Sequence, residues 1–397
     1  LNCDPLTIMR AKWTGIGVLV AVAVAAAGVI PAVAAGRHDD ADRGKQAERQ
    51  AEQRALRTAA EQKGRAKDKA KDKAGNKDRA GKGGRPGTRA SAKGVNDDPG
   101  FVQVFDNNVE NLPTAGLQCP GDWQDLVHYL KRAPLKPDLF VVQQISGRAQ
   151  LDDYVGRLSS IVGERYEGVI ADGSPKAMNS PCGAPKAHQT NAVIYRKARF
   201  TDLGLGSRTW VAQSQKGGKC ANSPQARTQA VKVKLHDKVA NKDLTVASVH
   251  WATASSGGPP CSVANSAETA REMTRDGYGG SLMIFGGDMN FSDVDGGRFR
   301  PWYRDLNGDL GGRHGFRDAG FAGCDGDKSC LADNWTNGAH RRIDFLFARK
   351  DSGLPRVTGF HTITFDEGDA ADHADTGSDR GDRNYSDHRA VMARIHY

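Results

Sequence analysis

The chain has 397 residues, seven cysteines and a formal net charge of +9. Residues 37–98 contain 18 lysines and arginines against 11 acidic residues, so most of the excess positive charge lies there and a strongly basic folded domain is excluded. The nearly neutral remainder, Pro99 to Tyr397, is long enough for one large domain with a sizeable core.

The N-terminal segment has the pattern of an export signal. From Met9, two basic residues precede an Ala/Val-rich apolar stretch that ends in small residues at Ala32 to Ala35. We therefore expect a signal peptide over residues 1–35, with Met9 as the true start, and a secreted protein. An uncleaved membrane anchor is the alternative, because the apolar stretch approaches the length that spans a bilayer.

Residues 36–98 form a separate basic linker rich in Lys, Arg, Ala and Gly. With almost no large apolar side chains, this segment cannot offset the entropy of ordering its chain, and we expect it to be disordered. Such a basic tail suits contact with nucleic acid or with anionic cell-surface polymers. A solvated linker without a partner is the alternative.

The cysteines indicate disulfides rather than a metal site. Six of them follow the signal segment, an even number that favours three disulfides in an oxidising compartment. No CxxC spacing occurs, which argues against zinc. The pairs we expect first are Cys324–Cys330, Cys220–Cys261 and Cys119–Cys182.

The segment from residue 99 to the end alternates strands with a few helices. Alternating or continuous apolar runs predict strands, and apolar residues spaced by three and four predict helices. Many strands with few helices predict an α/β domain in which two sheets pack face to face with helices outside. In chain order we expect strands at 101–109, 138–145, 166–171, 191–196, 229–235, 244–251, 281–290, 341–348, 357–365 and 390–395, with helices at 123–132, 151–161 and 267–275.

Polar side chains of the kind that handle phosphate and a divalent ion follow several of these strands. Asp344 is the most informative, because a carboxylate in the apolar run "IDFLF" needs a cation or a histidine partner. The full set is Asn108, Glu110, Gln143, Gln144, His250, Asp288, Asn290, Asp344, Asp387 and His388.

In this order the motifs resemble the endonuclease/exonuclease/phosphatase superfamily, over about residues 101–397. The matching segments are "NNVENL", "DLFVVQQI", "SVHW", "GGDMN", "RRIDFLF" and "YSDHRAV". The resemblance implies a four-layer α/β sandwich made of two mixed, mostly antiparallel sheets. It also implies a metal-dependent phosphodiesterase that uses magnesium, with manganese or calcium as alternative ions.

Roles for single residues follow from the resemblance. Asp344 would orient His388, which faces the phosphate, while Asp288 activates the water and His250 acts on the leaving group. Asn108 and Asn290 would bind phosphate oxygens. The predicted metal ligands are Gln144, Glu110 and Asp387.

Gln144 departs from the family pattern, which has a metal-binding Glu at this position. A neutral amide oxygen is a weaker ligand for a hard cation, and Glu110 is a candidate substitute. If nothing compensates, the domain keeps the fold and binds without cutting.

The resemblance and the export signal together favour a secreted nuclease that acts as a monomer on DNA or RNA, with the basic tail raising the local concentration of substrate. A sphingomyelinase-like phospholipid phosphodiesterase is the alternative enzyme. That activity needs an exposed aromatic surface, for which Trp210 and Trp302 are candidates if they lie on loops.

Overall fold

The computed structural model describes residues 94–109, 130, 133, 135–177, 188–211, 226–252, 258–337, 339–363, 386 and 388–397. All of them belong to one compact unit, residues 89–397. The signal segment, most of the basic linker, the helix expected at 123–132 except for Leu130, Glu110 and Asp387 lie outside the described residues. No helix of the described part is long and apolar enough to cross a membrane.

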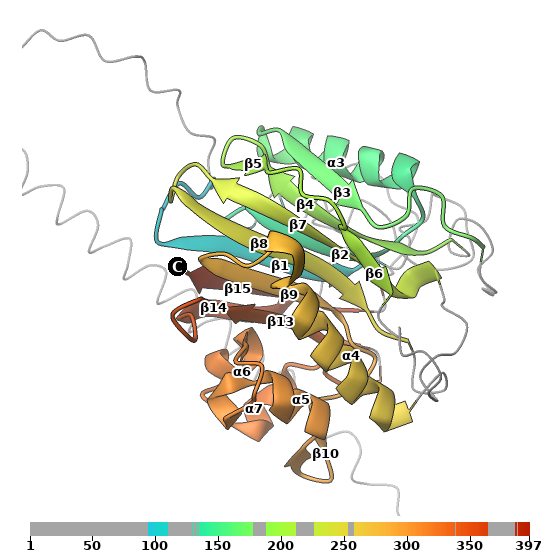
Figure 1. Cartoon of the computed structure of the whole chain (residues 1–397), viewed down its shortest axis with the longest axis vertical. Coiled ribbons are helices and arrows are strands. Elements are labelled where there is room, and N and C mark those ends of the chain that lie inside the picture. Colours follow the sequence, from blue (N-terminus) through green and yellow to red (C-terminus); the bar gives the residue numbers. More distant parts are fainter. Residues whose placement is uncertain are drawn as a thin grey trace, which may run out of the picture. The chain divides into compact units, whose positions relative to one another are not determined.

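The first sheet has six strands in the order β14-β15-β1-β2-β4-β3 (Figure 1). All its neighbouring strands run antiparallel except β1 and β2, which are parallel. The strands are β1 (Phe101–Asn108), β2 (Leu139–Ile145), β3 (Tyr166–Ile170), β4 (Thr190–Arg196), β14 (Val357–Ile363) and β15 (Ala390–His396).

The second sheet has the order β12-β13-β9-β8-β7-β5, and β6 also pairs with β7. Only β8 and β9 are parallel here, and α4 (Gly258–Glu272) makes the crossover that a parallel pair requires. The strands are β5 (Phe200–Asp202), β6 (Thr209–Val211), β7 (Gln229–Asp237), β8 (Lys242–His250), β9 (Leu282–Asp288), β12 (Arg317–Asp318) and β13 (Asp344–Arg349). A short hairpin joins β10 (Val294–Asp295) to β11 (Arg298–Phe299).

Three apolar cores separate four layers. The middle core lies between the sheets and combines side chains such as Val104 and Val141 with Val246 and Ile284. A second core packs α3 (Arg148–Val162) on the outer face of the first sheet, through residues such as Leu151. A third core covers the outer face of the second sheet with α4 and α5 (Pro301–Leu306). The predicted four-layer α/β sandwich is therefore confirmed.

The remaining helices are short. They are α6 (Ala319–Gly323), α7 (Lys328–Asp333) and the 3-10 turns η1 (Ala226–Thr228), η3 (Arg275–Gly277) and η4 (Gly308–Leu310). The helix expected at 151–161 is confirmed as α3. The helix expected at 267–275 begins earlier, at Gly258, because prolines are tolerated in the first turn of a helix, and it ends at Glu272.

Trp210 and Trp302, the candidates for an exposed aromatic surface, do not lie on loops. Trp210 belongs to β6 and Trp302 to α5, and both are buried in the third core, 8% and 1% exposed. The Trp302 ring packs edge to face against the Trp251 ring, with the ring centroids 5.2 Å apart. Neither side chain can therefore enter lipid.

The disulfide between Cys324 and Cys330 is confirmed, with the two Cα atoms 5.6 Å apart. Cys261 is also disulfide-bonded. The predicted pair Cys119–Cys182 and the predicted partner of Cys261, Cys220, lie outside the described residues.

Candidate active site

The predicted residues meet because four strands place apolar side chains in the middle core and carry a polar side chain at the same edge of the sandwich, three at their last residue and β13 at its first. On β8, Leu244 and Val246 face the middle core, and His250 follows them on the same face. The register then places His250 beside Asp288 across the parallel pair, and Asp344 beside Asp288 across the antiparallel pair. Strand pairing alone thus collects three of the predicted residues.

His388 and Asp344 form a hydrogen-bonded dyad. His388 Nδ1 lies 2.9 Å from Asp344 Oδ2, and Asp344 is fully buried. The hydroxyl of Thr336 accepts a hydrogen bond from the Asp344 backbone N–H, at 2.9 Å. Ser386 holds the other side: its hydroxyl donates to the Asn108 carbonyl at 2.5 Å and accepts from the His388 backbone N–H at 3.0 Å. The imidazole is therefore fixed in orientation, with Nε2 turned to the site.

Asp288 is the centre of the site. Its Oδ2 accepts a hydrogen bond from Asn108 Nδ2 at 3.1 Å and lies 3.4 Å from His250 Nε2 and 3.8 Å from His388 Nε2. Burial raises the pKa of Asp288; the charge of His250 opposes this rise, and that of Asp344 adds to it. One carboxylate thus connects both histidines and the predicted phosphate-binding amide of Asn108.

His250 is neutral under physiological conditions. Burial lowers its pKa to about 3, although the neighbouring Asp288 acts in the opposite direction. Because the pKa of Asp288 is raised while that of His250 is lowered, the 3.4 Å contact between them is not a full ion pair. A neutral imidazole at this place can donate a hydrogen bond to an oxygen of a ligand.

Arg227 brings a positive charge to the same place, and the sequence patterns did not indicate it. It lies on η1, and its charge contributes to the low pKa of His250. Burial lowers the pKa of Arg227, and the Asp288 charge counteracts that effect. Arg227 precedes Asp288 by about sixty positions in the chain, so no local pattern links the two.

Asn290 lies next to the site but uses its amide internally. Its backbone has a φ of 56°, in the left-handed region, and its N–H donates to Asp288 Oδ1 at 2.8 Å. Its side-chain Nδ2 donates to the Trp251 carbonyl at 2.6 Å. Asn290 therefore orients Asp288, and only its second amide hydrogen remains for a phosphate oxygen.

A buried polar layer lies beneath these residues, and Gln143 is the only one of its members that the sequence analysis selected. Asp106 accepts a hydrogen bond from Gln143 Nε2 at 2.9 Å, and the same amide donates to the Ser248 hydroxyl at 3.1 Å. Burial raises the pKa of Asp106 well above its ordinary value, and the Asp344 charge adds to this. Gly286 leaves room for Asp106, since a Cβ there would stand 3.1 Å from the Asp106 carboxyl carbon. This layer links the two sheets directly below Asp288.

Of the three predicted metal ligands, the structure describes only Gln144. Glu110 and Asp387 lie outside the described residues. The side-chain oxygen of Gln144 accepts a hydrogen bond from Gln189 Nε2 at 2.8 Å. Among the described residues, Asp288, Asp344 and His388 offer ligand atoms within 4.8 Å of one another, and Asp344 Oδ1 is buried without a hydrogen-bond partner. The charge and the free oxygen of this cluster fit a divalent ion.

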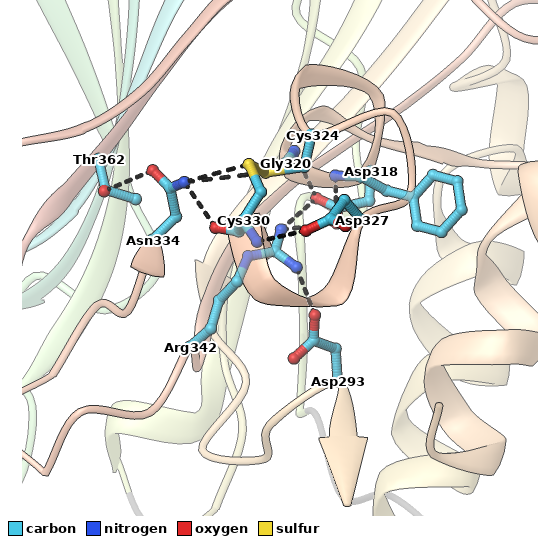
Figure 2. The surroundings of a disulfide bond; sticks show 10 residues. Asp293, Asp318, Gly320, Cys324, Asp327, Cys330, Asn334, Arg342 and Thr362 are labelled. Carbon is cyan, nitrogen blue, oxygen red and sulfur yellow. Dashed lines mark hydrogen bonds and ion pairs between the residues drawn. A yellow bond between two sulfur atoms is a disulfide. The ribbon is translucent and has the colours of Figure 1, made fainter. Parts of the chain in front are cut away.

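A buried arginine supports the segments on either side of the site (Figure 2). Arg342 donates to Asp293 Oδ2 at 2.7 Å, and to both oxygens of Asp318 at 2.7 and 2.6 Å. Asp293 belongs to the loop that follows Asn290, and Arg342 itself precedes β13 by two residues. The pair Arg342–Asp293 therefore fixes the loop after Asp288 against the strand that carries Asp344.

The geometry suits hydrolysis of an ester of an acid such as phosphoric acid. A histidine oriented by a carboxylate can take or give a proton, and a second, neutral histidine that lies beside the same Asp288 carboxylate can hydrogen-bond another oxygen. Asn108 and Arg227 add a neutral and a positively charged donor. Together these groups can bind an oxyanion and move a proton beside it.

No family model matches the chain, and no curated protein matches it significantly. Solved structures do match. An endonuclease/exonuclease/phosphatase family protein from Bacteroides thetaiotaomicron is 15% identical with a TM-score of 0.50, over 75% of this chain and 98% of that one. A mannosyl-6-phosphatase from the same organism is 16% identical (TM-score 0.49; 74% and 99% covered), and the human Nocturnin catalytic domain 13% (0.49; 75% and 93%). The chain therefore has the fold of the endonuclease/exonuclease/phosphatase proteins.

Proposed function

We propose that this protein hydrolyses phosphoester bonds, and that its substrates are the phosphodiesters of DNA or RNA. The observation that carries the proposal is the His388–Asp344 dyad, whose Nε2 lies 3.8 Å from the Asp288 carboxylate that also contacts His250. The fold, shared with an endonuclease/exonuclease/phosphatase family protein, supports the same class of reaction.

In the proposed reaction the described residues bind, orient and move protons as follows. Asp344 orients His388, and His388 Nε2 stabilises the phosphoryl group as its charge develops. Asp288 aligns the attacking water and accepts its proton. Neutral His250 donates a hydrogen bond to the leaving oxygen, and Asn108 donates to a non-bridging oxygen. Asn290 fixes Asp288 through its backbone N–H.

We propose magnesium as the ion, with manganese or calcium as substitutes. The described residues that would hold it are Asp288 and Asp344, and the sequence adds Glu110 and Asp387. When bound, the ion would neutralise charge on the phosphate oxygens and on the carboxylates.

In this proposal the nuclease is exported, and its basic segment, residues 36–98, contacts polyanions such as nucleic acid. The support is the sequence alone: the apolar stretch after Met9 and the basic composition of residues 36–98. A phospholipid phosphodiesterase is the second candidate. The burial of Trp210 and Trp302 removes the two aromatic side chains that favoured it.

The test uses the purified full-length protein. Its hydrolysis of plasmid DNA, RNA, sphingomyelin and a generic phosphate bis-ester is measured with and without magnesium. We expect cleavage of nucleic acid that requires the ion and that His388→Ala abolishes. Turnover of sphingomyelin alone would support the lipid enzyme. No turnover of any substrate would refute the catalytic proposal and leave a binding domain.

A matched control is present in the same chain. His236 Nδ1 lies 2.8 Å from Asp243 Oδ1, so this pair has the geometry of the dyad but sits on the β7–β8 hairpin. His236→Ala should leave every rate unchanged. If both variants lose activity equally, the loss reflects folding rather than chemistry.

A further inference from the structure

Gln144 lies in an irregular part of β2 at the edge of the site. Between Val142 and Ile145 the pairing with β4 shifts by one residue, so that two residues of β2 stand opposite one of β4. Gln144 has a φ of 59°, a left-handed conformation that is costly for a residue with a side chain. It follows Gln143, the residue paired with Asn108. A strained backbone is therefore maintained next to a predicted phosphate-binding residue.

The side chain of Gln144 is held by a second amide. Gln189 Nε2 donates to Gln144 Oε1 at 2.8 Å, and Gln144 is 7% exposed. The carbonyl oxygen, the only atom of this side chain that could coordinate a cation, thus already accepts one hydrogen bond and offers no charge to an ion. Within the described part of the chain, Gln144 Nε2 donates to no acceptor. Its two N–H groups remain for a ligand.

Amide N–H groups attract oxygen atoms that carry negative charge and repel cations. We propose that Gln144 is an anion-binding residue, which donates hydrogen bonds to a phosphate oxygen of the substrate and is not a metal ligand. Gln189 is its positioning residue, because its hydrogen bond turns the Gln144 carbonyl away from the ligand. The inference rests on the proposed function for its substrate class and assigns this position a role opposite to the one expected from sequence.

The test uses the full-length chain and two separate calorimetric titrations, one with inorganic phosphate in the absence of divalent ions and one with magnesium alone. Gln144→Met removes the donors and should weaken phosphate binding about tenfold, as expected for a hydrogen bond to a charged group, with unchanged magnesium affinity. Gln144→Glu keeps the size of the side chain and its contact with Gln189, and should weaken phosphate binding at least as much, through repulsion.

Gln103→Met is the matched control, since Gln103 is a buried glutamine on β1, near the opposite end of that strand from Asn108. It should change neither titration. A loss of magnesium affinity in Gln144→Met, or phosphate binding equal to that of the unmodified chain in both Gln144 variants, would overturn the inference. Phosphate binding too weak to measure in the unmodified chain would overturn it as well.

Hydrolysis measured in parallel separates this inference from the proposed function. An unmodified chain that cleaves nucleic acid, with phosphate affinity unaffected by Gln144→Met, would refute only the role of Gln144. An unmodified chain that binds phosphate through Gln144 but cleaves none of the substrates would refute only the catalytic proposal.

Discussion

Arg342→Met should strongly destabilise the protein. Arg342, Asp293 and Asp318 are each at most 4% exposed, and the guanidinium makes three charge-assisted hydrogen bonds of 2.6 to 2.7 Å to the two carboxylates. Methionine fills a similar volume but leaves both acids buried without their cation. Removing one partner of a buried ion pair costs about 3–5 kcal/mol. We expect a loss of free energy of unfolding in this range. In the variant, Asp318 keeps its hydrogen bond from the Tyr303 hydroxyl, whereas the buried charge of Asp293 has lost its cation.

Urea unfolding followed by circular dichroism measures this loss. The control is Arg313→Met, which breaks the Arg313–Asp305 pair of 2.9 Å, whose side chains are 63% and 35% exposed. Exposed pairs contribute at most about 1 kcal/mol, so this variant should unfold almost like the unmodified chain. Equal effects of the two substitutions, or a loss below about 1 kcal/mol for Arg342→Met, would refute the reasoning that burial makes this arginine essential.

The remaining predictions concern the dyad, a histidine and the disulfide. Asp344→Asn should lower the rate of phosphodiester hydrolysis about 10²–10⁴-fold with little change in substrate affinity, because His388 loses its orienting charge; a change confined to KM would contradict this. Because the pKa of His250 is about 3 when folded, against an ordinary 6.5, the unfolded chain takes up this proton first. The stability due to neutral His250 is therefore complete above pH 6.5 and lost as the pH falls towards 3. Urea midpoints between pH 7 and pH 4.5 should fall more steeply for the unmodified chain than for His250→Gln, and parallel curves would be inconsistent with this. Replacing Cys324 and Cys330 by serine should cost about 2 kcal/mol in the same assay, as expected for so short a loop, whereas no change would show that the loop is already ordered without the bond.

Strand positions were predictable because their pattern is local. Each of the ten expected strands alternates or runs apolar over five to nine residues, and this follows from which neighbours in the chain face the core. The strands of two or three residues, β5, β6, β10, β11 and β12, are too short to show such a pattern and were not expected. The same holds for Asp344, whose place in an apolar strand predicted a cation or a histidine as its partner; His388 is the histidine found there. The length of α4 was less predictable, since its buried face includes polar side chains such as Ser262 and Thr269.

Residues whose roles depend on a distant partner were not predictable. Gln189 precedes β4 without any pattern of its own, and only the pairing of β2 with β4 brings it to Gln144. Nothing in the local sequence distinguishes Asp106 from its neighbour Asn107. Only the packing of the two sheets places Asp106 under the site.

By itself, the sequence determined the ten expected strands and the polar residues at their ends, because these depend on short periodic patterns. The dyad of His388 with Asp344 was implied by the resemblance to the superfamily, and the cost of burying a lone charge supported it. The tertiary structure decided which of these side chains share a ligand and which are used internally. Asp288 became the centre of the site, and the Gln144 oxygen was taken by Gln189. Those outcomes depend on sheet register and sheet packing, which join residues tens to hundreds of positions apart and leave no local trace in the chain.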